Sequence, residues 1–106
     1  MKQLAIAMLT SCVFSTPVFA ADLEKGAKLS RQCSACHGKN GIARDPEVAN
    51  LAGQSALYLE KSLKDFQKGT REDRRMSLIV KNLSNQDIKD LAAWYASFEV
   101  TVVVPE

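Results

Sequence analysis

Apolar residues recur at helical spacing near the end of the chain, where the pattern is clearest. The positions follow one another at i, i+3, i+4, i+7 and i+10, and they are Ile88, Leu91, Ala92, Tyr95 and Phe98. This spacing places them on one face of a helix. Ser84 and Asp87 stand just before them in the arrangement of a capping box. We therefore expect a helix over residues 84–98.

Three earlier stretches also predict helices. Residues 22–32 begin at Asp22, a favourable N-cap, and carry small residues on one face. Residues 54–68 and 76–83 repeat apolar positions at the same spacing, and Gly69 is a natural stop for the first of them. No alternating pattern is strong enough to build a sheet. The prediction is an all-α fold of three to five short helices.

The remaining segments are predicted to form two loops and the C-terminal end of the chain. Residues 38–52 are rich in Gly, Asn, Asp and Pro, and residues 69–75 are charged. Residues 100–106 contain three consecutive valines with β-propensity. No partner strand is evident for them, so we expect a packed or frayed end.

The first twenty residues differ from the rest. Lys2 precedes an apolar run, and small residues follow at the end, as in Val18-Phe19-Ala20. This is typical of a secretory signal, so we expect residues 1–20 to be cleaved and residues 21–106 to form one domain outside the cytoplasm, in the periplasm. A retained membrane anchor is the alternative, but polar residues interrupt the apolar run well short of about 20 residues. Lipid attachment at Cys12 would leave too short an apolar core.

Size and charge narrow the possibilities further. The chain has 106 residues, of which 46% are hydrophobic and 25% charged, an ordinary globular composition. A net charge of +2 is too balanced for a protein that grips nucleic acid along a basic face. Because an apolar core seldom stabilises a chain of about 80 residues by itself, we expect something else to fill the middle of residues 21–106.

The chemistry-bearing motif is Cys33-Ser34-Ala35-Cys36-His37, which reads C-x-x-C-H, the attachment pattern of haem c. Two thiols three residues apart can each add to a vinyl group of the porphyrin, and the adjacent histidine then reaches the iron. A thioredoxin-like redox disulfide would need a βαβ context, which is missing. A zinc site would need about four ligands, and a structural disulfide over so small a loop would add little stability.

The second iron ligand follows from scarcity. Within residues 21–106 the chain has one histidine, His37, and one methionine, Met76. Met76 ends a charged loop, far enough from His37 in sequence for the chain to wrap round a porphyrin edge. We expect His37 and Met76 to be the axial ligands, with a gap-filling core methionine as the alternative for Met76.

Further motifs agree in order and spacing with a known family. They are Cys33–Gly38, Leu51-Ala52-Gly53-Gln54, Tyr58-Leu59, Leu63, Phe66, Gly69-Thr70-Arg71, Met76 and Leu91-Ala92-Ala93-Trp94-Tyr95. With them, residues 22–98 resemble a small bacterial class I c-type cytochrome, similar to one half of the periplasmic dihaem cytochromes c. The resemblance implies a cytochrome c fold wrapped around one covalent haem, with thioether links at Cys33 and Cys36. It also implies that the N-terminal and C-terminal helices cross near Gly26 and the pair Trp94 and Tyr95.

One position departs from the family. Members usually carry Pro-x-Leu before Ala-Gly-Gln, and the carbonyl of that proline accepts the hydrogen of the histidine ligand. Here Ala49 occupies the position. Because every residue has a backbone carbonyl, we expect the bond from His37 to persist, with its geometry open.

With both axial positions filled, the iron has no open site for substrate, so one-electron transfer is expected rather than catalysis. The expected partners are redox proteins: a quinol-oxidising complex, a terminal oxidase or reductase, or a dehydrogenase. The alternatives are a haem c subunit held in a periplasmic dehydrogenase and a gas-binding or peroxidatic haem protein. Basic residues around the two loops suggest steering towards an acidic partner, and they are Lys39, Lys61, Lys64, Lys68, Arg71, Arg74 and Arg75.

Overall fold

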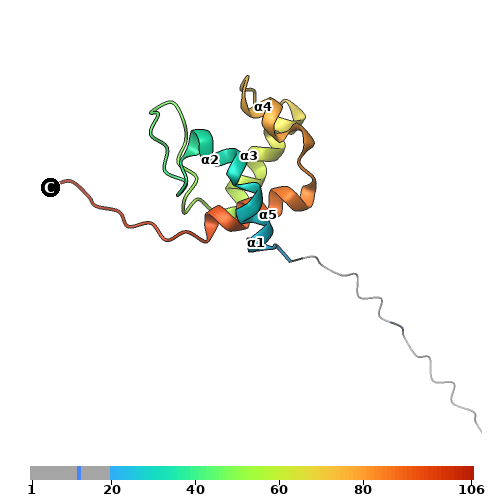
Figure 1. The fold of residues 1–106 in the computed structure, drawn as a ribbon, viewed down its shortest axis with the longest axis horizontal. Coiled ribbons are helices and arrows are strands. Elements are labelled where there is room, and N and C mark those ends of the chain that lie inside the picture. The colour runs from blue at the N-terminus through green and yellow to red at the C-terminus, as the bar shows by residue number, and fades with distance from the viewer. Residues whose placement is uncertain (1–11, 13–19) are drawn as a thin grey trace, which may run out of the picture.

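The computed structural model describes residue 12 and residues 20–106. The predicted signal segment, apart from Cys12 and Ala20, lies outside the described residues. Within these residues the chain forms five α-helices and no strand, which confirms the all-α prediction (Figure 1). The helices are α1 Leu23–Leu29, α2 Arg31–His37, α3 Ala56–Lys68, α4 Met76–Ile79 and α5 Asn85–Ala96, and a 3₁₀ turn at Val80–Asn82 follows α4.

The first predicted helix is two helices. The side chain of Asp22 accepts a hydrogen bond from Lys25 N at 3.0 Å and caps α1 as expected. The helix ends at Leu29 instead of continuing to residue 32, and α2 begins directly after Ser30. The Ser30 hydroxyl donates to Ala27 O at 2.8 Å, and such side-chain bonding to the preceding turn competes with continued helix. The cysteine motif therefore lies on α2, separate from α1.

The third helix confirms its predicted end at Lys68 and begins at Ala56, two residues after the predicted start at Gln54. Ser55 caps α3 by accepting from Tyr58 N, and Gly69 ends it in the left-handed conformation with φ +77°. Leu59 and Phe66 are buried on its inner face.

The predicted helix over 76–83 is shorter, because α4 gives way to the 3₁₀ turn after Ile79. Val80 in that turn is nevertheless fully buried, as its predicted inward position requires.

The last helix supplies most of the core. Ser84 and Asp87 form the predicted capping box, with Ser84 N donating to Asp87 Oδ2 and Asp87 N donating to Ser84 Oγ. The helix ends at Ala96, two residues before the predicted end at Phe98. Its buried apolar residues are those of the predicted stripe, namely Ile88, Leu91, Ala92 and Tyr95.

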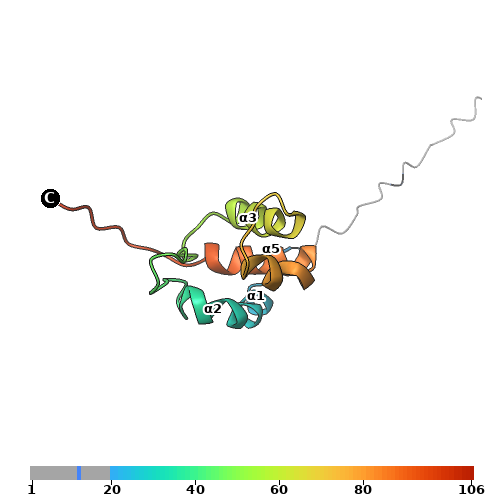
Figure 2. The same ribbon diagram turned by 90° about the horizontal axis from the view of Figure 1, so that it is seen from above.

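The α1 and α5 helices cross in close contact at Gly26. A Cβ atom at Gly26 would lie 2.2 Å from Asp90 O and 2.8 Å from Trp94 Cβ. Only glycine allows this approach. The crossing lies where the family resemblance implied it, and α5 lies between α1 and α3 (Figure 2).

The C-terminal segment leaves the helices as an extended chain (Figures 1 and 2). Residues 100–106 contain neither helix nor strand and are exposed, with Val103 at 86% of its maximal accessible surface. Of the packed or frayed end that was expected, this exposed segment fits the frayed one. None of the helices in the described part of the chain has the length and hydrophobicity needed to cross a bilayer.

Candidate functional site

A cavity of about 280 Å³ brings together the four residues that the sequence singled out. Cys33, Cys36 and His37 reach it from α2, and Met76 reaches it from the first residue of α4. A second, more open hollow beside Phe66 and Lys68 is lined by none of the four. The four residues thus share one site in the fold although 43 positions separate the first from the last.

The walls of this cavity are largely apolar. They come from α3, from the end of α4 and from the loop before α3, and the apolar lining residues are Val48, Ala49, Leu51, Tyr58, Leu59, Phe66 and Ile79. Leu59 and Phe66 are also buried residues of the fold. An apolar wall excludes water and lowers the local dielectric, which affects any redox group held there.

The imidazole of His37 is fixed by one strong hydrogen bond. Its Nδ1 lies 2.7 Å from Ala49 O. Because a carbonyl oxygen only accepts, Nδ1 carries the hydrogen and Nε2 keeps its lone pair for a metal. Such a bond orients a ligating histidine and raises its basicity. The expected bond to the carbonyl of residue 49 is confirmed with alanine in place of proline.

Backbone hydrogen bonds in the loop after α2 bring Ala49 to the histidine. Gly41 O accepts from Leu51 N at 2.8 Å and from Ala52 N at 3.1 Å, which closes the loop. Gly38, the first residue after the helix, has φ +82°, and a Cβ atom there would lie 2.0 Å from Ile42 O. The loop therefore needs glycine at this position, directly after His37.

The two cysteines are free thiols in the structure, with Cys36 exposed and Cys33 partly buried. Three positions apart on a helix, they lie on the same side of α2. Burial raises the pKa of the Cys33 thiol, while a hydrogen bond with Tyr95 acts in the opposite direction. Burial also raises the pKa of Tyr95 to about 12, so its hydroxyl stays protonated beside Cys33.

A residue that sequence reasoning missed holds Met76 in place. Asp73 Oδ1 accepts from Met76 N at 2.8 Å and from Arg75 N at 2.9 Å. These backbone hydrogen bonds lower the pKa of Asp73. The signal was present, since an aspartate three residues before an apolar helical run is a favoured capping pattern. Asp73 also lines the cavity.

Two of the seven basic residues noted in the sequence reach the cavity. Arg71 and Arg75 line it, and the Arg71 guanidinium lies 4.6 Å from the centre of the Phe66 ring. Lys61 and Lys64 instead form ion pairs with Asp65 and Glu60 along α3. The expected basic surface is thus partly compensated by acids of the same helix.

This donor set fits a covalently held haem. One imidazole with a free Nε2, one soft thioether sulfur and two thiols at the attachment spacing share an apolar cavity. A zinc site would need a different arrangement. No group of three or more His, Cys, Asp or Glu side chains positioned to hold a metal ion occurs in the part of the chain that the structure describes.

Comparison with known proteins agrees with this assignment. Residues 23–98 match the cytochrome c family. The chain is 36% identical over 101 residues to cytochrome c4 of Pseudomonas aeruginosa, which covers 95% of this chain and 50% of that protein. It is 41% identical over 83 residues to cytochrome c-554(548) of Halomonas halodenitrificans, covering 76% of this chain and all of the relative. The chain belongs to the cytochrome c family, and it binds haem c covalently.

Solved structures give the same fold. The reduced recombinant cytochrome c4 from Pseudomonas stutzeri superposes with a TM-score of 0.67 at 32% identity, covering 78% of this chain and 53% of that one. A thiosulfate dehydrogenase from Marichromatium purpuratum superposes with a TM-score of 0.69 at 27% identity, covering 74% of this chain and 19% of that one. The chain spans about half the length of its cytochrome c4 relatives.

Proposed function

We propose that the chain is a periplasmic one-electron carrier in which Cys33 and Cys36 hold the haem by thioether bonds and His37 and Met76 ligate its iron. The convergence of these four residues on one cavity is the observation that carries the proposal. When bound, the haem iron supplies one-electron chemistry between Fe(III) and Fe(II).

The protein's own residues prepare the site for that role. Ala49 O holds the His37 ring so that Nε2 is available to the iron. Asp73 ties the backbone of Met76 at the start of α4 and so limits the positions that the sulfur can reach. The thioether favours Fe(II), and the apolar wall acts in the same direction because it favours the lower charge. If His37 and Met76 both ligate the iron, they would leave no open coordination position for a substrate.

Replacement of Met76 tests this proposal. Met76→Ala removes the methionine of residues 21–106, so the iron loses its sulfur ligand and ferrous protein binds carbon monoxide. The potential should fall by on the order of 0.1 V, a modest part of the roughly 0.8 V that axial ligation spans. Leu78→Ala is the matched control, since Leu78 lies on the same short helix and is 70% exposed. Carbon monoxide binding by the unmodified ferrous protein at neutral pH would instead support the gas-binding or peroxidatic alternative.

A carrier diffuses between its redox partners, whereas a subunit stays bound to one of them. A carrier docks briefly through a small interface, steered by complementary charge. The proposed donors and acceptors are a quinol-oxidising complex and a terminal oxidase or reductase. The rate of reduction by the partner should fall as ionic strength rises if Arg71 and Arg75 contribute to steering.

A second candidate function is a haem c subunit of a periplasmic dehydrogenase. The structural likeness to one part of a thiosulfate dehydrogenase favours it, and the exposed valines of residues 100–106 could provide the contact. Size-exclusion chromatography of native periplasm separates the two functions. Elution as a small protein supports the carrier, and comigration with a larger dehydrogenase supports the subunit.

A further inference from the structure

A fully buried carboxylate lies where α1 meets α5, away from the cavity. Asp90 has no exposed surface. Its Oδ1 accepts from Asp22 N at 2.8 Å and from Gln86 Nε2 at 2.9 Å. Its Oδ2 accepts no hydrogen bond from the residues that the structure describes. A buried carboxylate with one bare oxygen is costly unless a cation pairs with it.

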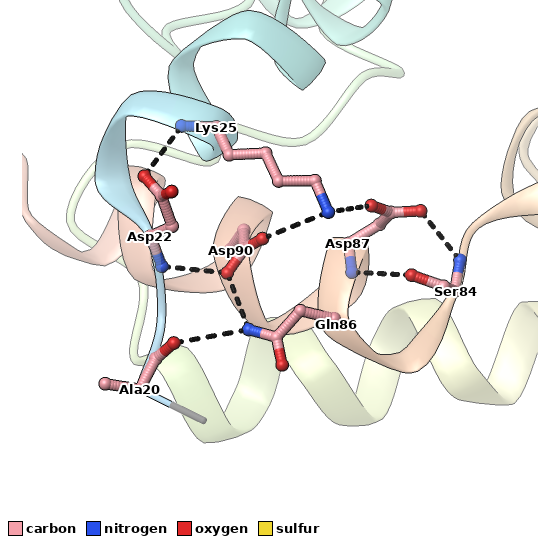
Figure 3. Close-up of polar contacts among 7 residues, drawn as sticks. All are labelled: Ala20, Asp22, Lys25, Ser84, Gln86, Asp87 and Asp90. Atoms are coloured by element: carbon pink, nitrogen blue, oxygen red, sulfur yellow. Dashed lines mark hydrogen bonds and ion pairs between the residues drawn. The ribbon is translucent and has the colours of Figure 1, made fainter. Parts of the chain in front are cut away.

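The cation nearest to Asp90 is shared with another carboxylate. Lys25 Nζ lies 2.9 Å from Asp87 Oδ1 but 3.6 Å from Asp90 Oδ2. Its hydrogen bond to Asp87 is the largest cause that lowers the pKa of Asp87 to about 2. Asp22 adds a third carboxylate at the start of α1. The Lys25 ammonium therefore pairs with two carboxylates, and the nearby carboxylate of Asp22 gives the cluster in Figure 3 an excess of negative charge.

The backbone that leads into α1 is held against this cluster. Asp22 N donates to Asp90, and Gln86 Nε2 lies 3.3 Å from Ala20 O (Figure 3). Successive backbone nitrogens are at most about 3.6 Å apart, so the nitrogen of Ala21 lies within roughly 6.5 Å of Asp90 Oδ1. That nitrogen belongs to the peptide bond at which the signal is expected to be cut.

We propose that Asp90 and Gln86 form a receptor for the processed N-terminus, in which the α-ammonium group of Ala21 supplies the missing positive charge. The inference rests on the proposed cleavage after Ala20. Hydrolysis adds water across that peptide bond, which leaves a carboxylate on the departing Ala20 and an ammonium on Ala21. Gln86 loses the Ala20 carbonyl, and its own side-chain oxygen becomes an acceptor for the new ammonium. The contact forms in the processed protein alone.

The charge of the receptor predicts a measurable change in the Ala21 amine. An unperturbed α-amine has a pKa near 7.7–8.0, and an opposite charge within about 6 Å raises it. The charged groups of the cluster are Asp22, which caps α1, Lys25 of α1, and Asp87 and Asp90 of α5, and their net charge is negative. Because the folded-state pKa is raised, the contact stabilises fully below about pH 8 and is lost as pH rises through the raised value.

The test uses the mature haem-loaded protein. Intact mass first establishes that the chain begins at Ala21, and acetylation rates of the α-amine across pH then give its pKa. We expect a pKa at least about one unit above the ordinary value, which returns toward that value in Asp90→Asn. Glu24→Gln is the matched control, because it also removes one acid, from an 81% exposed side chain that pairs with Lys28. An ordinary pKa in the unmodified protein, or equal pKa values in Asp90→Asn and Glu24→Gln, would overturn the proposal.

A second variant keeps Asp90 in case its replacement impairs folding. Two glycines inserted between Ala20 and Ala21 move the α-ammonium away from the receptor and restore a peptide nitrogen at Ala21. We expect a lower urea midpoint below pH 8, with the loss of stability between pH 8 and 10 diminished. Equal midpoints and equal pH profiles for the two proteins would contradict the receptor, as would a mature chain that begins elsewhere. Recovery of the protein without covalent haem would instead count against the proposed function.

Discussion

The α1–α5 crossing and the cavity are built from contacts of different kinds. At the crossing, the packing contacts come from the chain itself: Gly26 admits the backbone of Asp90, and Asp90 Oδ1 accepts from Asp22 N. Around the cavity, the candidate haem-binding side chains make few bonds within the chain. His37 bonds through one nitrogen, and the thiols of Cys33 and Cys36 are free.

This difference indicates that two kinds of contact stabilise the small chain: direct packing at the crossing and the bound haem at the cavity. The crossing specifies its own geometry through complementary surfaces, because a close-packed contact tolerates little change in volume. The cavity side consists of short helices and loops whose donors point to a group that the polypeptide does not supply. Since an apolar core of this size is marginal, we expect the haem to complete the fold on that side.

The largest effect is expected from loss of haem attachment. Cys33→Ser combined with Cys36→Ser removes both thioether links, so the cavity side loses the group that its residues surround. We expect a broad, weakly cooperative unfolding curve in urea, followed by far-ultraviolet circular dichroism.

The exposed Ala35 between the two cysteines provides the control. Ala35→Ser should keep the haem and a sharp transition. A double variant that unfolds as sharply and at the same midpoint as the haem-loaded protein would show that the cavity side needs no haem.

The second largest loss of stability is expected from a substitution at the α1–α5 crossing. Gly26→Ala places a methyl group 2.2 Å from the Asp90 carbonyl oxygen, so the helices must separate. We expect a loss of about 3 kcal/mol, at the upper end of overpacking costs, measured from urea midpoints.

Gly69→Ala separates packing from backbone strain. Gly69 has φ +77°, whereas Gly26 has the backbone of helix α1, and a Cβ atom at Gly69 meets no atom within 4 Å. Its cost should be the roughly 1–2 kcal/mol of a left-handed alanine. Equal losses for the two variants would contradict close packing at Gly26.

A smaller effect is expected where the backbone positions a ligand. Asp73→Ala removes the acceptor for Met76 N and Arg75 N, as the loss of a helix cap does. Added imidazole should then displace Met76 about fivefold more readily, as judged from the visible spectrum.

The conservative variant Asp73→Asn tests whether the lost hydrogen-bond acceptor causes the easier displacement of Met76. Asp73→Asn keeps an oxygen acceptor and should restore most of the resistance to imidazole. If Asp73→Ala and the unmodified protein bind imidazole equally, Asp73 does not position Met76.

The smallest expected effect is on the stability of the fold at acidic pH. The pKa of Asp87 is lowered from 3.8 to about 2, first by the hydrogen bond from Lys25 and then by Ser84. Stability from this group is present above the unfolded value and is lost as pH falls from about 4 to 2. Asp87→Asn and Lys25→Met should each flatten the decline of the urea midpoint over that range. An unchanged acid profile in both variants would show that the pair contributes nothing.

The same contrast explains what sequence could and could not predict. The start of α5 and the end of α3 were predictable because Ser84, Asp87 and Gly69 act locally, through their own backbone neighbours. The C-x-x-C-H motif was predictable because its chemistry depends on spacing alone. The gathering of Met76 with this motif could be expected from its scarcity, from its place at the end of a charged loop and from the family resemblance.

The second helix was missed for a physical reason. Residues 31–37 have no apolar stripe, and none of them is buried. Periodicity detects helices that bury a face in the core, whereas this helix faces the cavity. The role of Asp73 was missed because a charged loop hides a single capping residue among other charges.

One measurement tests the central claim most directly: the alkaline pyridine spectrum of the purified periplasmic protein, combined with its intact mass after denaturation. The account predicts one iron porphyrin per chain, saturated at both vinyl positions and still attached when the protein is unfolded. A colourless mature protein, or a porphyrin that separates from the denatured chain, would contradict it.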